Sequence, residues 1–404
     1  MIVNVFSIGS APPNAIAEAA EPYGGCTFVV EPDDAAALAS VPVLQELGEV
    51  VVADGVDACV RALGGRVPAG VVTFADRGLR LASGLARHYG LPGLSEKAAE
   101  WCCDKIAQRE RLNACGVGDV PTAPLRGGVF PAEVPMPAVV KPREGAGSED
   151  TAFVHSAEEF RALMTQLSPD RPYVVERYIE GVDTPFGPLL TDSVSVESAV
   201  DARGAVRHIG VTLRLPLAPP ARDTGLVFPV HRDSALTGTL LELAAAAIAA
   251  VDFTAGITHI EFKLSPDGPV VIEVNGRLGG GLYRLMPRVG TVEPVGLATA
   301  LAVGEPLPDA FAEPTGHAMH YYAQPPYGAV AVSALPSPRT VRGVPGVFGA
   351  DPRTRAGAPV HWRQGSAGRV YDIWIAADTL AELDQRRAAV DELLEQTTGW
   401  EYER

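Results

Sequence analysis

Charged side chains interrupt two neighbouring apolar segments of the sequence. Glu261 lies in the first segment, at residues 256–264, and Glu273 lies in the second, which begins at residue 270. Residues 265–268 between the segments, Ser-Pro-Asp-Gly, are typical of a hairpin turn, which would pair the segments as antiparallel strands. Two carboxylates that face each other across a hairpin repel unless a cation lies between them. The spacing therefore predicts a cation site between Glu261 and Glu273.

The second strand continues into two more polar residues, Asn275 and Arg277. Alternate residues of a strand share one face, so both are expected beside Glu273. Carboxylate and amide oxygens suit Mg²⁺, which proteins commonly share with substrate phosphates, and a planar guanidinium fits phosphoryl oxygens. The other interpretation is that these residues form the solvent-exposed face of an antiparallel sheet. The repulsion between the two carboxylates favours the metal site.

The hairpin resembles the metal-binding signature of the ATP-grasp superfamily. The matching letters are H-x-E, then a hairpin, then E-x-N-x-R followed by L-G-G-G. The resemblance implies that Glu261, Glu273 and Asn275 hold magnesium, or manganese in its place, against the phosphates of ATP. It also implies that Arg277 contacts the transferred phosphoryl or acyl-phosphate group, and that Gly279–Gly281 leaves room for substrate.

Two lysines upstream match the superfamily's phosphate-binding lysines. Lys105 follows an aspartate at the start of a predicted helix, and Lys141 ends the predicted strand V-V-K-P, before E-G-A-G-S. Glycines let the backbone approach phosphate closely, and successive N–H groups form an anion-binding nest. A solvated helix lysine and a plain glycine-rich turn are the other interpretations. The resemblance places these residues on the phosphates: Lys105, Lys141, Gly145, Gly147 and Ser148.

The segment Y-V-V-E-R-Y-I-E-G-V-D resembles the superfamily's hinge strand, which reads adenine. The resemblance puts Glu176 at the edge of the base and the backbone of Arg177 and Ile179 against it. It puts Asp183 on the ribose hydroxyls. Glu180 is the alternative ribose ligand, and both acids could instead be ordinary loop residues.

Several basic residues are candidates for the carboxylate substrate. Arg284 follows the glycine-rich segment and could pair with the carboxylate of an amino acid, or it could be a structural surface arginine. Arg214 and His231 border a Pro-rich loop and are weaker candidates. His259 could orient Glu261 or pack within the sheet. The predicted catalytic residues are Arg277, Lys141 and Arg284.

The segments that position these residues point to an α/β protein. Alternating apolar runs and helical patterns predict a parallel α/β domain at residues 1–95. An ATP-grasp domain with a lid at about 120–190 and an antiparallel-sheet core is expected at 96–303. A C-terminal α+β region at 304–404 would complete the ligase core. The predicted strands of the first domain are 2–8, 27–30, 49–53 and 71–73, and the elements beyond it are helix 104–114, strand 138–141, helix 157–167, strands 173–177, 193–200 and 206–213, a Pro-rich loop at 215–230, helix 234–251, strand 369–376 and helix 380–395.

Composition excludes several functional classes. The formal net charge of −16 and an aromatic content of 6% argue against a nucleic-acid partner. Five cysteines without a C-x-x-C pair are typical of reduced thiols in a cytoplasmic protein. The N-terminus does not resemble a signal peptide, and no apolar run is long enough to span a bilayer.

The resemblance as a whole implies an ATP-dependent ligase that joins a small-molecule carboxylate to an amine through an acyl-phosphate. It is most like the L-amino acid ligase and dipeptide synthetase group, with the looser similarity at residues 315–404. It also allows a homodimer. An alternative of the same fold is a carboxylase or a nucleotide-pathway ligase. A non-catalytic ATP-binding regulatory module is the second alternative, which the intact metal and arginine positions argue against.

Overall fold

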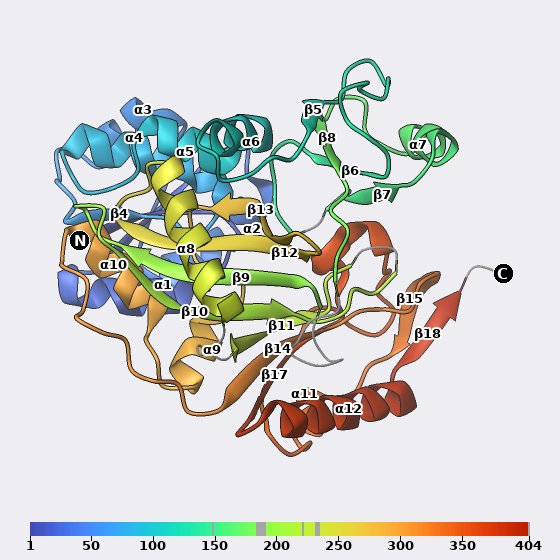
Figure 1. The fold of residues 1–404 in the computed structure, drawn as a ribbon. Helices are drawn as coiled ribbons and strands as arrows, with labels where there is room; N and C mark the ends of the chain where they lie inside the picture. Colours follow the sequence, from blue (N-terminus) through green and yellow to red (C-terminus); the bar gives the residue numbers. More distant parts are fainter. Residues whose placement is uncertain (148, 183–190, 220–221, 231–234, 403–404) are drawn as a thin grey trace.

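A parallel sheet with helices on both faces forms the N-terminal part of the computed structural model, which describes residues 1–147, 149–182, 191–219, 222–230 and 235–402 (Figure 1). Its strand order is β3-β2-β1-β4, and apolar residues fill both faces as a buried parallel sheet requires. The predicted α/β arrangement is therefore confirmed. The elements are β1 (Ile2–Phe6), α1 (Pro13–Ala20), β2 (Cys26–Val30), α2 (Ala35–Leu47), β3 (Glu49–Val52), α3 (Gly55–Ala62), β4 (Gly70–Val72), the 3₁₀ turns η1 (Glu21–Tyr23) and η2 (Asp76–Gly78), and α4 (Leu79–Tyr89).

Two short helices lead from this sheet to a small antiparallel sheet that stands apart at the upper right of Figure 1. The small sheet has the order β5-β8-β6-β7, with α7 packed on it around a separate apolar cluster. It lies within the segment expected to form a lid. The elements are α5 (Glu96–Cys103), α6 (Lys105–Ala114), β5 (Thr122–Pro124), β6 (Ala138–Pro142), β7 (Ala152–Val154), α7 (Ala157–Met164) and β8 (Tyr173–Arg177).

The centre of the molecule is an eight-stranded sheet with the order β13-β12-β9-β10-β11-β14-β17-β16. One apolar cluster packs α8 and α12 against it, and a second packs α9 and α10 between it and the N-terminal sheet. Strands from the last hundred residues thus extend the sheet that carries the hairpin. The elements are β9 (Ser193–Val200), β10 (Val206–Arg214), β11 (Gly225–Val230), α8 (Ala235–Ala250), β12 (Gly256–Ser265), β13 (Gly268–Asn275), α9 (Leu282–Arg288), α10 (Pro294–Val303), β14 (His317–Ala323), β16 (Val347–Pro352), β17 (Tyr371–Ala377) and α12 (Leu380–Thr397).

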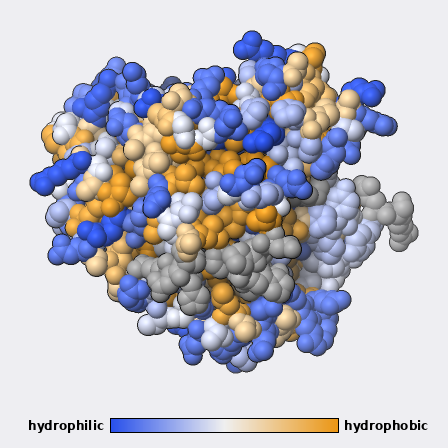
Figure 2. Space-filling model, viewed as in Figure 1, coloured by the Kyte–Doolittle hydropathy of each residue, from blue (hydrophilic) through white to orange (hydrophobic). Residues whose placement is uncertain are grey.

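The remaining C-terminal elements lie outside this sheet. They are β15 (Ala329–Ala334) and β18 (Gly399–Tyr402), which pair with each other, together with α11 (Pro338–Val341) and the 3₁₀ segment η3 (Trp362–Gly368). Apolar side chains are visible over α8 in Figure 2. Within the described ranges, no helix combines the length and apolarity needed to cross a bilayer. All five cysteines are free thiols.

The prediction of a loop at 215–230 is wrong for residues 225–230. Residues 225–230 form β11, which pairs with β10 on one side and with β14 on the other. The prolines and charges before it suggested a loop, but the run L-V-F-P-V is wholly buried in the central sheet. Other differences are at element ends: the helix predicted at 157–167 ends at Met164, and the strand predicted from 369 begins at Tyr371.

The hairpin at the sheet's edge has the register expected from the sequence. Glu261 of β12 is the direct cross-strand partner of Glu273 of β13, and His259 is the partner of Asn275. A bulge follows Glu261, where the register shifts by one residue. The unpaired residue of the bulge is Ile272 of β13, so Lys263 of β12 lies opposite the apolar Val270. Lys263 instead forms an ion pair with Asp192.

Candidate active site

The start of α6 places the first lysine. Asp104 caps this helix, because its Oδ1 accepts hydrogen bonds from the backbone N–H groups of Ile106 (2.9 Å) and Ala107 (3.2 Å). Its Oδ2 accepts a hydrogen bond from the guanidinium of Arg143. The backbone carbonyl of Arg143 in turn accepts a hydrogen bond from the backbone N–H of Lys105. Lys105 is consequently the first residue of the helix, held beside the end of β6.

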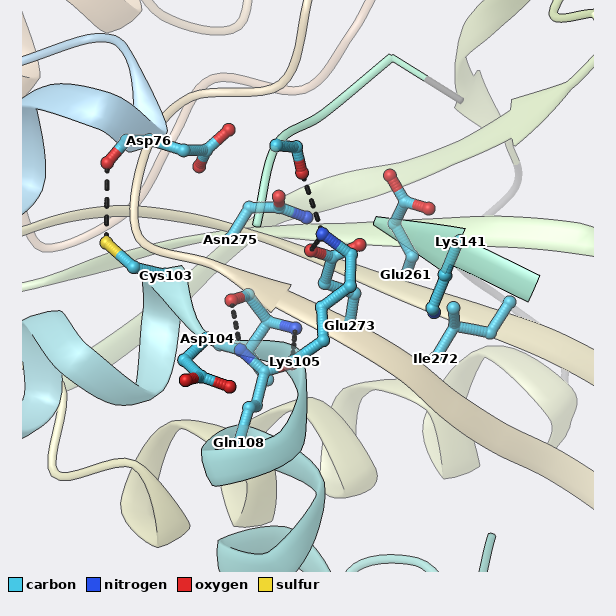
Figure 3. Close-up of polar contacts among 12 residues, drawn as sticks. Asp76, Cys103, Asp104, Lys105, Gln108, Lys141, Glu261, Ile272, Glu273 and Asn275 are labelled. Atoms are coloured by element: carbon cyan, nitrogen blue, oxygen red, sulfur yellow. Dashed lines mark hydrogen bonds and ion pairs between the residues drawn. The ribbon is translucent and has the colours of Figure 1, made fainter. Parts of the chain in front are cut away.

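Lys105 connects the glycine-rich segment to the hairpin (Figure 3). Its Nζ donates a hydrogen bond to the carbonyl oxygen of Gly145 at 2.7 Å and lies 3.1 Å from Oε1 of Glu273. Only 10% of its side chain is exposed. Burial alone would lower the pKa of Lys105, but the attraction and hydrogen bond of Glu273 raise it above its ordinary value. This contact pattern differs from that of a solvated helix lysine.

The second lysine lies in a buried ion pair under the small sheet. Lys141 of β6 and Glu176 of β8 approach to 2.7 Å, and Arg109 of α6 lies 4.0 Å from the other oxygen of Glu176. Burial raises the pKa of Glu176, but Lys141 and Arg109 hold it below its ordinary value. Glu176 is therefore an anchored carboxylate, which fixes the position of Lys141.

Replacing Lys141 with methionine is expected to weaken both folding and ATP binding. It leaves Glu176 buried without its closest cation, and breaking a buried ion pair from one side costs about 3 kcal/mol of unfolding free energy. Urea denaturation and ATP titration measure the two effects. Adding Glu176→Gln should restore part of the stability but none of the ATP affinity. Lys97→Met, at an exposed position of α5, is the control, and wild-type behaviour of Lys141→Met in both assays would contradict the assignment.

The carboxylate of Glu261, on the hairpin, belongs to a row of hydrogen-bonded side chains that are largely buried. Its Oε1 accepts hydrogen bonds from Arg214 at 2.6 Å and from Nε2 of His259 at 3.1 Å. Nδ1 of His259 lies 2.6 Å from Glu197, a fully buried carboxylate of β9. Burial lowers the pKa of His259, but Glu197 raises it to about 9. Burial raises the pKa of Glu261, while Arg214 and His259 hold it well below its usual range. His259 is accordingly a buried cation that orients Glu261.

Asn275 and Arg277 complete the hairpin's polar row. The Nδ2 group of Asn275 donates to the carbonyl oxygen of His259 at 3.1 Å, and its Oδ1 lies 3.3 Å from Nη2 of Arg277. Nε and Nη2 of Arg277 also donate to Oδ2 of Asp76, at 3.1 and 2.8 Å. Burial lowers the pKa of Arg277, but the attraction and hydrogen bonds of Asp76 raise it above its ordinary value.

The donor set fits a magnesium site shared with phosphate. Two cross-strand carboxylates and a neighbouring amide are hard oxygen ligands, and Mg²⁺ sites of this kind take one or two carboxylates plus substrate oxygens. Each carboxylate is paired with a cation, Glu261 with Arg214 and Glu273 with Lys105, which offsets their mutual repulsion. The described residues contain no cluster of three His, Cys, Asp or Glu side chains suited to a metal. The predicted third protein ligand here is the amide of Asn275.

Two buried imidazoles support the glycine segment after Arg277. A Cβ atom on Gly279 would lie 2.6 Å from Nδ1 of His259, and one on Gly281 would lie 2.1 Å from Nδ1 of His320. His320 of β14 stacks on Trp374, with ring centroids 3.6 Å apart, and its Nε2 lies 2.9 Å from Asp372. These contacts prevent His320 from moving aside. The segment is consequently packed too tightly for side chains at both positions.

Gly281→Ala is expected to destabilise the fold by about 1–3 kcal/mol more than Gly290→Ala. Both glycines have positive φ, +81° and +79°, so they share the backbone strain of a non-glycine residue. The new Cβ at Gly290 would meet its nearest neighbour at 3.9 Å, whereas the one at Gly281 would overlap His320. Overpacking of this kind costs about 1–3 kcal/mol beyond the shared strain. Thermal unfolding measures the difference, and equal losses at the two positions would show that the packing is not rigid.

The other predicted residues have mixed environments. Arg284 of α9 pairs with Asp351 at 2.6 Å and lies 4.5 Å above the ring of Trp374, so its assignment to a substrate carboxylate stays a prediction. The backbone N–H of Arg177 donates to the carbonyl of Pro121 at 2.9 Å, which occupies that donor. Gly147 accepts a backbone hydrogen bond from Ser366 of η3 at 3.3 Å. Ser148, Asp183 and His231 lie outside the described residues. The roles of Ile179, Gly145 and Glu180 on a nucleotide also stay predictions.

Three charged residues of the site were missed in the sequence. Asp76 follows β4 of the N-terminal sheet, Arg109 lies in α6, and Glu197 lies in β9. The sequence does contain a usable signal for Glu197, because an acidic residue inside a predicted buried strand needs a partner. Asp76 and Arg109 lie in amphipathic or loop segments, where charged residues are ordinary.

The comparisons with known proteins agree with this geometry. Residues 102–281 match the family model described as an ATP-grasp domain. The fold is similar to that of an L-amino acid ligase from Bacillus licheniformis, with a TM-score of 0.76, 19% identity, and coverage of 100% of this chain and 98% of that one. It is also similar to N5-carboxyaminoimidazole ribonucleotide synthetase from Thermus thermophilus, with a TM-score of 0.67, 20% identity, and coverage of 97% and 98%.

The sequence relatives match only part of the chain. An uncharacterised protein of Sinorhizobium fredii is 29% identical over 254 residues, which are 59% of this chain and 49% of that protein. The D-alanine–D-alanine ligase of Mycobacterium tuberculosis is 29% identical over 174 residues, 41% of this chain and 46% of that one. The chain thus spans about half the length of these curated relatives. The predicted fold class is confirmed, and the family model places an ATP-grasp domain at residues 102–281.

Proposed function

We propose that this chain, which contains an ATP-grasp domain at residues 102–281 and has the fold of that superfamily, is an ATP-dependent carboxylate–amine ligase. The observation that carries the proposal is the convergence of Lys105, Glu273, Glu261 and Arg277 in one partly buried site. The division into domains at 1–95, 96–303 and 304–404 is part of the proposal. The central sheet supports it, because it unites the second and third segments.

The lysines and the hairpin supply the groups that a bound nucleoside triphosphate needs. Lys105 and Lys141 would lie on the phosphates, with the backbone of Gly145 and Gly147 beside them. Magnesium, or manganese, held by the hairpin oxygens of Glu261, Glu273 and Asn275 would neutralise phosphate charge when bound. Lys105 pairs with Glu273 and Lys141 with Glu176, so binding ATP would exchange one set of ion pairs for another.

The proposed reaction begins with attack of a substrate carboxylate oxygen on the γ-phosphorus of ATP. The bond between that phosphorus and the β–γ bridging oxygen breaks, which releases ADP and forms an acyl-phosphate. An amine then attacks the acyl carbon, loses a proton, and displaces phosphate, leaving an amide. Such transfers depend on positioning and charge stabilisation, and Arg277 is the residue placed to stabilise the phosphoryl charge.

An amino acid is the carboxylate substrate that the comparisons favour. The solved structure similar over the whole chain is named an L-amino acid ligase, and a curated relative is named a D-alanine–D-alanine ligase. A carboxylase or nucleotide-pathway ligase is the second candidate. It is favoured by the similar fold of N5-carboxyaminoimidazole ribonucleotide synthetase. Small molecules are the proposed partners in both cases, and a homodimer stays a prediction.

A screen for ADP release separates the two candidates. The purified chain is incubated with ATP, Mg²⁺ and pairs of amino acids, and products are identified by mass spectrometry. The proposal predicts ADP formation that requires at least one amino acid, together with a new amide. Turnover that requires bicarbonate would support the second candidate. A complete panel of pairs without ADP release would contradict peptide-bond formation.

A further inference from the structure

An ion pair joins the N-terminal sheet to the proposed catalytic arginine. Asp76 lies in η2, directly after β4, and Arg277 lies two residues beyond the end of β13. Two N–H groups of Arg277 donate to the same carboxylate oxygen, Oδ2 of Asp76, at 3.1 and 2.8 Å. Figure 3 shows Asp76 on the side of the site where Asn275 lies. The two residues are 201 positions apart in the chain, so only the packing of the two sheets brings them together.

The pair is withdrawn from solvent and incompletely satisfied. The exposed fraction of the side chain is 12% for Arg277 and 18% for Asp76. The other oxygen of Asp76, Oδ1, is buried and has no hydrogen-bond partner among the described residues. A buried acceptor without a partner is destabilising. Because replacing such a pair with apolar residues often leaves stability unchanged, stability alone does not account for it. Unsatisfied buried groups of this kind gather at functional sites.

Among the hydrogen bonds of the Arg277 guanidinium, those to Asp76 reach a residue far away in the sequence. The other bonds of Arg277 are local: Nη1 donates to the carbonyl of Leu278 at 3.0 Å, and Nη2 to Oδ1 of Asn275 at 3.3 Å. Packing leaves space behind this segment, because a cavity of about 50 Å³ between β4, α4 and α10 is lined by Gly276, Arg277 and Leu278. Local bonds and apolar packing therefore constrain the arginine loosely, and Asp76 supplies the fixed point.

We propose that Asp76 is a positioning residue, which aims the guanidinium of Arg277 at the phosphoryl group in transit. The N-terminal sheet would then take part in catalysis through this contact. The inference rests on the proposed function, since it needs a transferred phosphoryl group for Arg277 to meet. Asp76 acts on the reaction through Arg277. Its removal should therefore lower the rate only as much as misplacement of the arginine does. A misplacement of about 1 Å can lower a rate about 100-fold.

Nucleotide binding without turnover provides the test. Affinities for ADP and for ADP with aluminium fluoride, which imitates a phosphoryl group in transit, are measured with Mg²⁺ by calorimetry. Asp76→Ala should leave ADP affinity within about 2-fold, because the lysines are untouched, and lower affinity for ADP–aluminium fluoride about 10-fold or more. Asp76→Asn, which keeps an acceptor oxygen but loses the charge, should fall between the wild type and Asp76→Ala. Glu49→Gln removes an exposed ion pair with Arg66 from the same sheet and is the matched control.

A double-mutant cycle distinguishes positioning from an independent effect. If Asp76 acts through Arg277, Asp76→Ala combined with Arg277→Ala should bind ADP–aluminium fluoride no more weakly than Arg277→Ala alone. Losses that multiply, or an unchanged affinity in Asp76→Ala, would overturn the role of Asp76 and leave the proposed function intact. A wild-type protein that binds ADP–aluminium fluoride no better than ADP would overturn the proposed function and the role of Asp76 together. If Asp76→Ala fails to fold, Asp76→Asn and its double mutant give the same comparison.

Discussion

Replacing Glu273 with glutamine is expected to lower ATP turnover about 100-fold or more, which corresponds to about 2.7 kcal/mol of transition-state stabilisation. Glutamine keeps the size of the side chain and one carbonyl oxygen but removes the charge that would hold a metal opposite Glu261. It also leaves Lys105 without its carboxylate partner, so positive charge near the phosphates increases. The variant should therefore bind ATP without a large loss of affinity and fail in the metal-dependent step.

A magnesium titration of ADP formation measures this effect. Glu273→Gln should need a higher Mg²⁺ concentration for half-maximal activity, in addition to its lower maximal rate. Glu242→Gln, at an exposed position of α8, is the matched control and should behave like the wild type. Unchanged turnover and magnesium dependence in Glu273→Gln would contradict the proposed role of Glu273 as a metal ligand.

Replacing Arg277 with alanine is the second large change, with an expected loss of about 100- to 1000-fold in kcat. The guanidinium is a buried cation held by Asp76 and Asn275, and Asn275 is one of the proposed metal ligands. Lysine at this position keeps the charge but loses the planar fork, so Arg277→Lys should recover only part of the activity. ATP affinity should change little in either variant, because the proposed ligands of the ground-state phosphates are Lys105 and Lys141.

Steady-state kinetics in ATP and in the carboxylate separate these effects. A fall in kcat with an unchanged KM for ATP indicates an interaction made in the transition state. Arg87→Ala removes an exposed ion pair with Glu96, and it controls for the loss of a positive charge. A kcat for Arg277→Ala equal to that of the wild type would exclude this arginine from phosphoryl transfer.

The local features of the site could be predicted because each depends on neighbouring residues. Alternation of side chains along a strand and a good turn sequence were enough to place Glu261 opposite Glu273, and that register is confirmed. The start of α6 was predictable in the same way, because an aspartate before Lys105 provides the cap. The alternation of strands and helices before residue 95 predicted the parallel sheet.

Long-range contacts could not be predicted from the same patterns. The pair of Asp76 and Arg277 depends on how two sheets pack, and nothing local marks Asp76. The neutralisation of Glu261 by Arg214 depends on a strand order that places β9 between β10 and β12. The strand β11 was missed because proline and charged residues precede it, although its burial in the central sheet overrides their preference for a loop.

The fate of one oxygen atom tests the central claim most directly. The amino acid found in the screen is labelled with oxygen-18 in its carboxylate and allowed to turn over with unlabelled ATP. Attack of the carboxylate on the γ-phosphorus predicts that each phosphate released carries one labelled oxygen, while the amide keeps the other. Phosphate without label, formed together with the amide, would contradict an acyl-phosphate.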